Sequence, residues 1–596
     1  MIIWHPSADH RYTRRQLVRD GARAVVATIV VGTVADLVAA CGGQTQSPST
    51  STTSAGGSAA TAASATPSAS PGAAPSTSTG AVVQGGTLHY GTIGDVAYGS
   101  LDMTTTTGTS DAEVALGMED AYIYLTSDGK FVPGLAESWD MSPDGLTYTF
   151  KLRQGVTFHD GTPFNADAVK YNFDRITDKK RNPNGLSYSY IGAGVSYDGC
   201  EVVDPYTVRH HLKTPNAIFL YRLRRVWFSP QSPPAIDKWG SEYFRHPVSV
   251  GPFKFVEWVQ GDHVTMAANP DYKRGPNALF PNTGKPYLDQ VVHRIITDLS
   301  TKASALESGE LEYAAGLNPT DVARFQHTNG IAVRIRDQMG QSVQISLNVE
   351  KPPTDDLAVR QAISWGIDRD ALSKTVFLGL YPPATHIFTP NLWSYDASLN
   401  SLNGYDPQKA GQILDAAGWK MGSNGVRAKN GQELRIRWLD GQSAQAEVQF
   451  VQAQLKKIGV AVDIQIMPSS ALLEATLRGD HNATAGTGNW IQEDPDVLRN
   501  WLASSLINVR QNYVRVRDPK LDALLNQGIA FVGDPHSPER EKVYQQLQQT
   551  VMQNYYVIPL VYPKSLEAYR PTVQADNIGY DPYGTYHYWN NVWIRK

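Results

Sequence analysis

The chain has 596 residues, a length that exceeds one ordinary domain and is enough for two or three. Hydrophobic residues make up 41% and charged residues 18%, which suits a soluble globular protein, and the 13 Trp and 29 Tyr suit a chain that lines a large cleft. The formal net charge of −4 gives no support to a nucleic-acid partner.

The first 40 residues have the features of an export signal. Arg14 and Arg15 stand in a Thr-Arg-Arg-Gln-Leu-Val-Arg run that resembles a twin-arginine signal. An apolar run follows at 24–34, with the length of a signal-peptide core and too short for a typical membrane span. Leu-Val-Ala-Ala-Cys at 37–41 resembles a lipobox, in which Cys41 carries the lipid. We therefore expect residues 1–40 to be a signal peptide, the alternative being a buried N-terminal helix.

Residues 42–84 consist mainly of Ser, Thr, Ala, Gly and Pro and carry no charge. Such a segment cannot bury enough apolar surface to order itself, so we expect 41–84 to be a lipidated cysteine followed by a flexible tether. The chain has 2 Cys, and lipidation of Cys41 would leave Cys200 without an intramolecular disulfide partner.

The folded part begins near Gly85, and hydrophobic periodicity predicts its elements in chain order. In the first half we expect strands at 87–91, 121–125, 146–152, 202–212, 250–258 with a second strand after the turn, 291–296, 311–315 and 342–349. We expect helices from 111, from a cap at Asn165, at 217–226, and at 302–308 with a stop at Gly309. His210 and His211 are neighbours that would point to opposite faces of a strand, and we expect both on the surface.

The second half shows the clearest pattern, a strand-helix-strand-helix-strand run at 434–439, 444–457, 460–466, 470–478 and 483–490. This order implies parallel pairing with right-handed crossovers, and ligands of such sheets collect outside the carboxyl ends of the strands. Further helices are predicted at 356–369, 406–417, 521–530 and 539–554, and a strand at 557–562.

Three blocks of sequence carry a resemblance to a known family. The first, within 134–176, reads A-E-S-W and then S-P-D-G-L-T-Y-T-F-K-L-R-Q-G-V-T-F-H-D-G-T-P-F-N-A-D. The second is V-G-P-F-K-F-V-E-W from Val250, followed by N-P-D-Y at 269–272, and the third runs from Leu347 to Arg369. Together they resemble the extracellular solute-binding proteins, family 5, of oligopeptide, dipeptide and nickel ABC importers, over roughly residues 86–596.

The resemblance implies an α/β, two-lobed periplasmic-binding-protein-like fold (class II, large type with an extra subdomain), with hinged lobes around a central cleft. It places the first lobe at 85–340 and 556–596, with the extra subdomain at about 126–240, and the second lobe at 341–555. The implied function is that of a monomeric lipoprotein on the outer face of the cytoplasmic membrane, in a periplasmic space or at the cell surface. It would capture a small peptide or other solute and deliver it to an ABC permease, with no cofactor.

The family also suggests a ligand site. In its peptide binders an acidic residue three positions after a Trp takes the α-ammonium of the ligand. Here Trp490 is followed by Glu493 at that position, and Asp494 replaces the usual Tyr. A buried ammonium needs a charged partner, which Glu493, Asp494 and Asp496 could supply. The alternative is an acidic surface loop.

Other functions stay open in the sequence. The same fold serves oligosaccharide-binding and metal-chelate-binding proteins, and a solute-sensing receptor lipoprotein would look alike. We expect no enzyme, because neither G-x-S-x-G nor H-E-x-x-H occurs, although catalytic triads need not be local. We expect no protein-held metal either, because no Cys/His cluster has metal-ligand spacing.

Overall fold

A computed structural model describes residues 81–92, 96, 99–106, 109–126, 129–178, 180, 196–273, 279–441, 444–485, 493–509, 512–575, 579–580 and 587–596. All of them belong to one compact unit, Pro75–Lys596. The predicted signal peptide with Arg14 and Arg15, the lipid site Cys41, nearly all of the tether and Trp490 lie outside the described residues.

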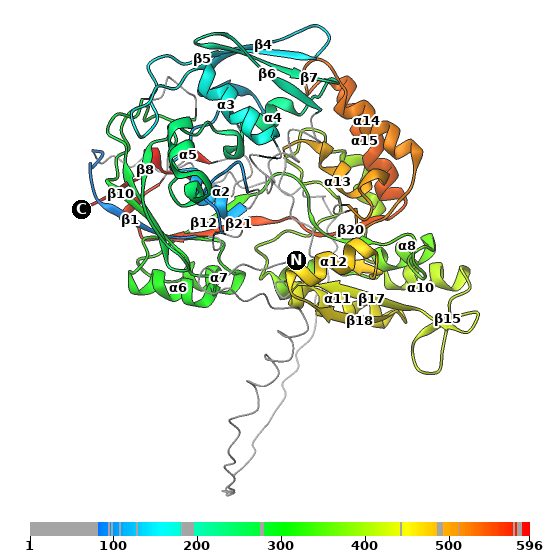
Figure 1. The fold of residues 1–596 in the computed structure, drawn as a ribbon. Coiled ribbons are helices and arrows are strands. Elements are labelled where there is room, and N and C mark those ends of the chain that lie inside the picture. The colour runs from blue at the N-terminus through cyan, green and yellow to red at the C-terminus, as the bar shows by residue number, and fades with distance from the viewer. Residues whose placement is uncertain are drawn as a thin grey trace, which may run out of the picture. The chain divides into compact units, whose positions relative to one another are not determined.

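The first large sheet has seven strands in the order β12-β21-β11-β1-β10-β9-β8 (Figure 1). Their bounds are β12 Ala332–Asp337, β21 Lys564–Tyr569, β11 Tyr313–Ala315, β1 Thr87–Gly91, β10 Gln290–Arg294, β9 His263–Ala268 and β8 Phe253–Val259. Strand β1 runs parallel to β10 and β11, and the outer pairs are antiparallel. Helix α6 (Leu299–Ser308) ends at Gly309 with φ 89°, as the sequence predicts, and together with α7 (Pro319–Phe325) covers the β11 and β21 strands through a buried apolar cluster.

The second large sheet has five strands in the order β18-β17-β19-β13-β20. Strands β17 (Arg435–Asp440), β18 (Ala461–Ile466) and β19 (Ala483–Thr484) are parallel, with α11 (Gln445–Lys457) and α12 (Ser469–Arg478) between them. The predicted strand-helix repeat is therefore confirmed, although residues 486–490 of its last strand lie outside the described part. Two further strands complete the sheet, β13 (Val343–Leu347) and β20 (Val557–Val561). Strand β13 runs antiparallel to both of its neighbours, β19 and β20.

The chain passes between the two large sheets twice among the described strands. It leaves the seven-stranded sheet after β12 and enters the five-stranded sheet at β13, and it returns between β20 and β21. The strands on either side of these two crossings pair with each other. Strand β12 pairs with β21 in the seven-stranded sheet, and β13 pairs with β20 in the five-stranded sheet. The strand 557–561 belongs to the five-stranded sheet, so the chain returns to the seven-stranded sheet between residues 561 and 564. The lobe limits themselves stay a prediction.

A separate four-stranded antiparallel sheet has the order β4-β5-β7-β6, with bounds β4 Ala136–Met141, β5 Thr147–Leu152, β7 Thr207–Leu212 and β6 Tyr197–Asp204. A tight turn precedes β5, with Gly145 at φ 70° and its N–H bonded to the Ser142 carbonyl at 2.8 Å. Helix α3 (Ala166–Thr177) packs against this sheet, and its predicted cap Asn165 accepts a hydrogen bond from the Ala168 N–H at 2.9 Å.

Two predictions in this sheet are wrong. Residues 202–212 form parts of two strands, because the chain turns at Pro205 and Tyr206 between β6 and β7. His210 is fully buried, because the Phe173 ring of α3 and the Tyr197 ring cover its face of the sheet, and its Nδ1 lies 2.8 Å from the Tyr197 hydroxyl. Burial lowers the pKa of His210 to about 3, so the ring is neutral.

The remaining elements surround these sheets. Around the four-stranded sheet lie α2 Thr109–Ala115, β2 Ile123–Leu125, β3 Phe131–Pro133, α4 Phe219–Leu223, η2 Val226–Phe228, α5 Pro233–Trp239 and η3 Gly240–Arg245. Near the five-stranded sheet lie α8 Leu357–Trp365, α9 Arg369–Val376, η4 Ala397–Leu402, α10 Pro407–Ala416, β14 Lys420–Met421, β15 Arg427–Lys429, β16 Gln432–Glu433, η6 Pro495–Leu498, α13 Arg499–Leu502, η7 Ser504–Leu506, α14 Pro519–Ile529 and α15 Pro538–Gln553. The C-terminal pieces are β22 Val573–Gln574, β23 Gly579–Tyr580, β24 His587–Tyr588, η8 Trp589–Asn591 and β25 Trp593–Ile594.

Two features near α4 bear on the site. The predicted helix 217–226 is shorter than expected, ending at Leu223 before a 3-10 turn. Ala217 beside it donates its N–H to the Ile529 carbonyl at the end of α14 at 2.8 Å, so these elements adjoin (Figure 1).

No helix within the described ranges is both long enough and apolar enough to cross a membrane.

Candidate ligand-binding site

The acidic segment that the sequence singles out is buried. Glu493, Asp494 and Asp496 are each 4–5% exposed. They follow β19 in the chain, beyond the carboxyl end of the parallel strands, where the strand order predicts ligand-binding groups. The alternative of an exposed acidic loop is therefore excluded for these three side chains.

Asp494 is held in a two-pronged ion pair. Its Oδ2 lies 2.7 Å from Nη1 of Arg540 and its Oδ1 lies 2.9 Å from Nη2 of the same guanidinium, on helix α15. Burial alone would lower the pKa of Arg540, but the Asp494 carboxylate more than offsets it, and the pKa is raised. Asp494 also caps η6 by accepting the Asp496 N–H at 2.9 Å. This carboxylate is thus committed to joining the loop to α15.

Asp496 is held in the same way by a second arginine. Arg499 reaches its two oxygens with Nε at 3.0 Å and Nη2 at 3.1 Å, and the Tyr544 hydroxyl of α15 donates to Oδ1 at 2.9 Å. With both oxygens bonded, Asp496 has the features of a structural carboxylate. The geometry favours the same role for Asp494, so neither has an evident vacancy for a ligand ammonium.

Glu493 differs from its two neighbours. Arg224 donates from Nε to its Oε1 at 2.5 Å, and both side chains are almost completely buried, at 2% and 4% exposure. The other oxygen, Oε2, is buried and has no hydrogen-bond partner among the residues that the structure describes. The Glu493 carbonyl is fixed by the Trp393 indole N–H at 3.1 Å. Glu493 is therefore an oriented carboxylate with one acceptor atom left over.

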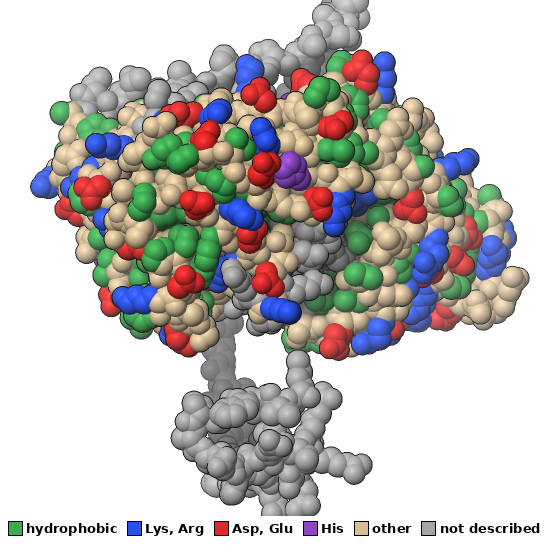
Figure 2. Space-filling model, turned by 45° about the horizontal axis from the view of Figure 1, so that its top comes forward, with side chains coloured by type: hydrophobic (Ala, Val, Ile, Leu, Met, Phe, Trp, Pro, Cys, Tyr) green, Lys and Arg blue, Asp and Glu red, His purple; other side chains and the backbone are tan. Residues whose placement is uncertain are grey.

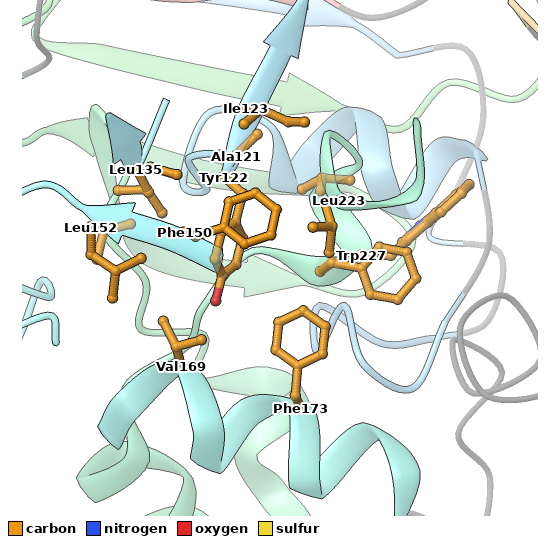
Figure 3. Packing of buried hydrophobic residues seen from close by; sticks show 14 of the residues in the cluster. Ala121, Tyr122, Ile123, Leu135, Phe150, Leu152, Val169, Phe173, Leu223 and Trp227 are labelled. Carbon is orange, nitrogen blue, oxygen red and sulfur yellow. The ribbon is translucent and has the colours of Figure 1, made fainter. Parts of the chain in front are cut away.

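Arg224 is placed by the apolar packing on either side of it in the chain. Leu223 and Trp227 enter the cluster that also contains Phe150 and Phe173, as Figure 3 shows. This anchoring puts Arg224, the residue that ends α4, in reach of Glu493, which is 269 positions away. Sequence reasoning missed Arg224, although an arginine inside an apolar helical run was a visible signal.

The side chains around the Arg224–Glu493 pair also connect α4 with the segment that precedes α15. The Tyr221 hydroxyl of α4 contacts Nε2 of His536, which precedes α15. His536 in turn lies against Trp393, with ring centroids 5.0 Å apart. Burial lowers the pKa of His536, which favours the neutral ring in this contact with the Tyr221 hydroxyl. The ion pair thus lies where α4 meets the elements near the five-stranded sheet.

Other chemistry receives no support from the described residues. Within them, no group of three or more His, Cys, Asp or Glu could hold a metal ion. Cys200 is buried and free, and burial raises its pKa to about 12, which makes it a poor nucleophile. Figure 2 shows acidic and basic side chains interspersed over the face it displays, without a large region of one sign.

The sequence matches the model of the bacterial extracellular solute-binding proteins, family 5 (Middle), over residues 130–508. Among curated proteins it is 30% identical over 490 residues to the glutathione-binding protein GsiB of Escherichia coli O1:K1 / APEC, covering 80% of this chain and 90% of the relative. It is 34% identical over 368 residues to GsiB of Pectobacterium atrosepticum, covering 62% and 67%.

Solved structures agree with the sequence comparison. The ABC transporter-associated periplasmic binding protein DppA of Helicobacter pylori, in complex with the peptide STSA, superposes with a TM-score of 0.71 at 28% identity, over 86% of this chain and 99% of that one. NikA of Brucella suis, in complex with Fe(III)-EDTA, gives a TM-score of 0.74 at 26% identity, over 86% and 100%. The expected two-lobed fold is confirmed by these matches. The chain therefore belongs to family 5 of the bacterial extracellular solute-binding proteins, and it is a binding component of an ABC importer and not an enzyme.

Proposed function

We propose that this protein captures a peptide-like solute between its two lobes and delivers it to a membrane permease. Support comes from its relatives, which are named for glutathione, and from its similarity to a binding protein solved with a peptide. Ligand that contacts both lobes only when they are closed shifts the population toward the closed state, which is the form a permease would receive. The two paired crossing segments between the large sheets suit such a hinge.

The observation that carries the proposal is the unused oxygen of Glu493. A buried acceptor without a partner costs about 1–3 kcal/mol, and a ligand N–H that reaches Oε2 would remove that cost. Arg224 binds Oε1 and thereby orients the carboxylate, which leaves Oε2 as the acceptor for an ammonium. We assign the α-ammonium of the ligand to Glu493, with Asp494 and Asp496 holding the loop in place. Trp490, which lies outside the described residues, stays a ligand contact predicted from the sequence.

The test is a Glu493→Gln variant, titrated calorimetrically with reduced glutathione and with the peptide Ser-Thr-Ser-Ala, each compared with its N-acetylated form. Whichever free-amine ligand binds the wild type should bind the variant more weakly, by about 1–4 kcal/mol, because one partner of a charged pair is lost. The preference over the acetylated form should shrink as well. An unchanged dissociation constant for the free amine would sink the assignment.

Folding has to be separated from binding in this test, because Glu493→Gln leaves Arg224 buried without its counter-ion. The double variant Arg224→Gln, Glu493→Gln removes both charges and keeps two amides of similar size. It should melt closer to the wild type than the single variant, yet still bind the free amine weakly. The exposed residue Glu474 supplies a matched Glu→Gln control that should change neither property.

We further propose that the protein is an exported lipoprotein, with Arg14 and Arg15 in the export signal and Cys41 as the lipid site. The segment 42–84 would then be a tether that lets the binding domain reach the permease. An oligosaccharide or a metal chelate as ligand, and a role in solute sensing, are the alternatives. The similarity to NikA with Fe(III)-EDTA is the observation in favour of a chelate.

A further inference from the structure

One face of the five-stranded sheet carries buried polar side chains. On β13, Val343, Ile345 and Leu347 all enter the apolar cluster shared with α8 and α11. Successive side chains of a strand point to opposite faces, so Gln344 lies on the other face.

Thr484 belongs to the same polar face. Ser346 of β13 is paired in register with Thr484 of β19, and the neighbouring pair is Leu347 with Ala483. Because Leu347 and Ala483 both enter the apolar cluster, Ser346 and Thr484 are turned away from it. Gln344 and Thr484 thus lie on adjacent strands and share one face of the sheet.

Several polar atoms on and next to this face are buried and make no hydrogen bond to any described residue. Gln344 is 1% exposed, Thr484 is 0% exposed, and Gln341 just before β13 is 2% exposed. The Oε1 atom of Gln344, the hydroxyl of Thr484 and both amide atoms of Gln341 have no hydrogen-bond partner among the described residues. Each of these groups is removed from water without a replacement hydrogen bond, so the folded protein gives up stability to keep them.

Comparable residues close by in the structure are satisfied. Thr389, 3% exposed, accepts the Gly340 N–H at 2.9 Å, next to Gln341 in the chain. Gln548, 0% exposed, donates to the Ser394 and Tyr544 carbonyls at 2.8 and 3.0 Å. The polar groups of Thr389 and Gln548 are thus paired, whereas the named atoms of Gln341, Gln344 and Thr484 have no partner among the described residues.

Their position fits ligand contact. Thr484 is the last residue of β19 and lies at the carboxyl end of the parallel strands, the edge at which ligands of such sheets bind. Gln341 stands in the segment that crosses from β12 to β13, and it forms a β-bridge with Phe388. Glu493 follows Thr484 by nine positions along the same chain segment.

We propose that Gln341, Gln344 and Thr484 form an uncharged binding surface for the amide groups of a peptide main chain. Two amides and a hydroxyl offer both donors and acceptors, which matches the alternating N–H and C=O groups of a peptide and carries no charge preference. This assignment rests on the proposed function for the class of ligand. Glu493 would fix one end of the ligand, and this surface would bind its uncharged body.

The first arm of the test measures stability of the full-length protein without ligand, in detergent. Thr484→Val and Gln344→Met replace unused polar groups by apolar groups of similar shape, so both variants should melt at or above the wild-type temperature. Thr389→Val and Gln548→Met are the matched controls. They break hydrogen bonds that exist and should melt lower than the wild type.

The second arm measures binding of a tryptic casein digest supplemented with reduced glutathione, by native mass spectrometry at increasing ligand concentration. Half-occupancy of Thr484→Val and Gln344→Met should need at least ten times more ligand than the wild type. The two controls should bind as the wild type does.

The proposal requires both results. Variants of Thr484 and Gln344 that melt as low as the controls, or that bind peptide like the wild type, overturn it. If the wild type itself binds no peptide, the proposed function fails. The assignment of a peptide ligand to this surface then fails with it, whereas peptide binding by the wild type together with unchanged binding by the variants overturns this inference alone.

Discussion

Glu119 is a buried carboxyl that the folded protein keeps in its neutral form. It is 3% exposed and accepts a hydrogen bond from the Ser249 hydroxyl. Burial raises its pKa to about 8, against the Ser249 hydrogen bond and with a further contribution from the carboxylates of Asp102 and Asp120. Since the pKa in the folded protein exceeds the ordinary 4.5, its contribution to stability is full below about pH 4.5 and is lost as the pH rises through about 8.

A Glu119→Gln variant should remove this pH dependence, because the amide stays neutral at every pH. At pH 5 the variant and the wild type should melt together. At pH 9 the variant should be more stable, by up to about 4 kcal/mol. Thermal unfolding at the two pH values checks this, with the exposed residue Glu310 as a Glu→Gln control. An equal difference at both pH values would show that Glu119 is not the group responsible.

At the candidate site, the sequence predicts which residues form the acidic group but not the ion pairs that each of them makes. The sequence identifies Glu493, Asp494 and Asp496 as a group, but not which of them is free for a ligand. That depends on Arg224 and Arg540, which lie 269 and 46 positions away from their partners. Pairing across such distances is decided by tertiary packing, which has no local pattern in the chain.

At the level of elements, periodic segments were predicted well. The expected 434–439, 444–457 and 460–466 agree with β17, α11 and β18 within one residue at each end. There, each strand and helix has its own period, and a turn separates it from the next. The stretch 202–212 failed because its alternation continues on both sides of the Pro205 turn, so the pattern resembles one strand.

His210 shows a second limit at this scale. A strand's alternation says which residues share a face, but not whether that face is covered. The coverage comes from Tyr197 on β6 and from Phe173 on α3, whose rings lie 5.8 and 4.4 Å from the His210 ring centroid. Both are brought there by the order of the sheet, which the local sequence does not contain.

At the scale of the whole molecule, two large sheets are joined by two paired crossing segments, and the acidic loop is held to α15 by Arg540. This architecture supplies a hinge next to a loop with fixed geometry. The Arg224–Glu493 ion pair already joins the α4 side to the loop side, and a ligand ammonium at Oε2 of Glu493 would add to this contact.

Anchoring to a membrane is a property of the full chain. A Cys41→Ser variant, expressed in the native host, should appear in the soluble exported fraction, because its only proposed attachment is the lipid on that cysteine. Cell fractionation with immunodetection measures this, and Cys200→Ser serves as the matched control that should stay with the membrane. Membrane association that persists in Cys41→Ser would refute the lipobox assignment.

The central claim is that a family 5 fold here carries a peptide. The most direct measurement is native mass spectrometry of the unit Pro75–Lys596 after purification from an extract of its own host. We predict a retained mass that is released on activation and fragments as a peptide with a free amino terminus. A retained sugar or metal chelate would contradict the claim, and the search for ligand contacts would then move from Glu493 to the aromatic side chains.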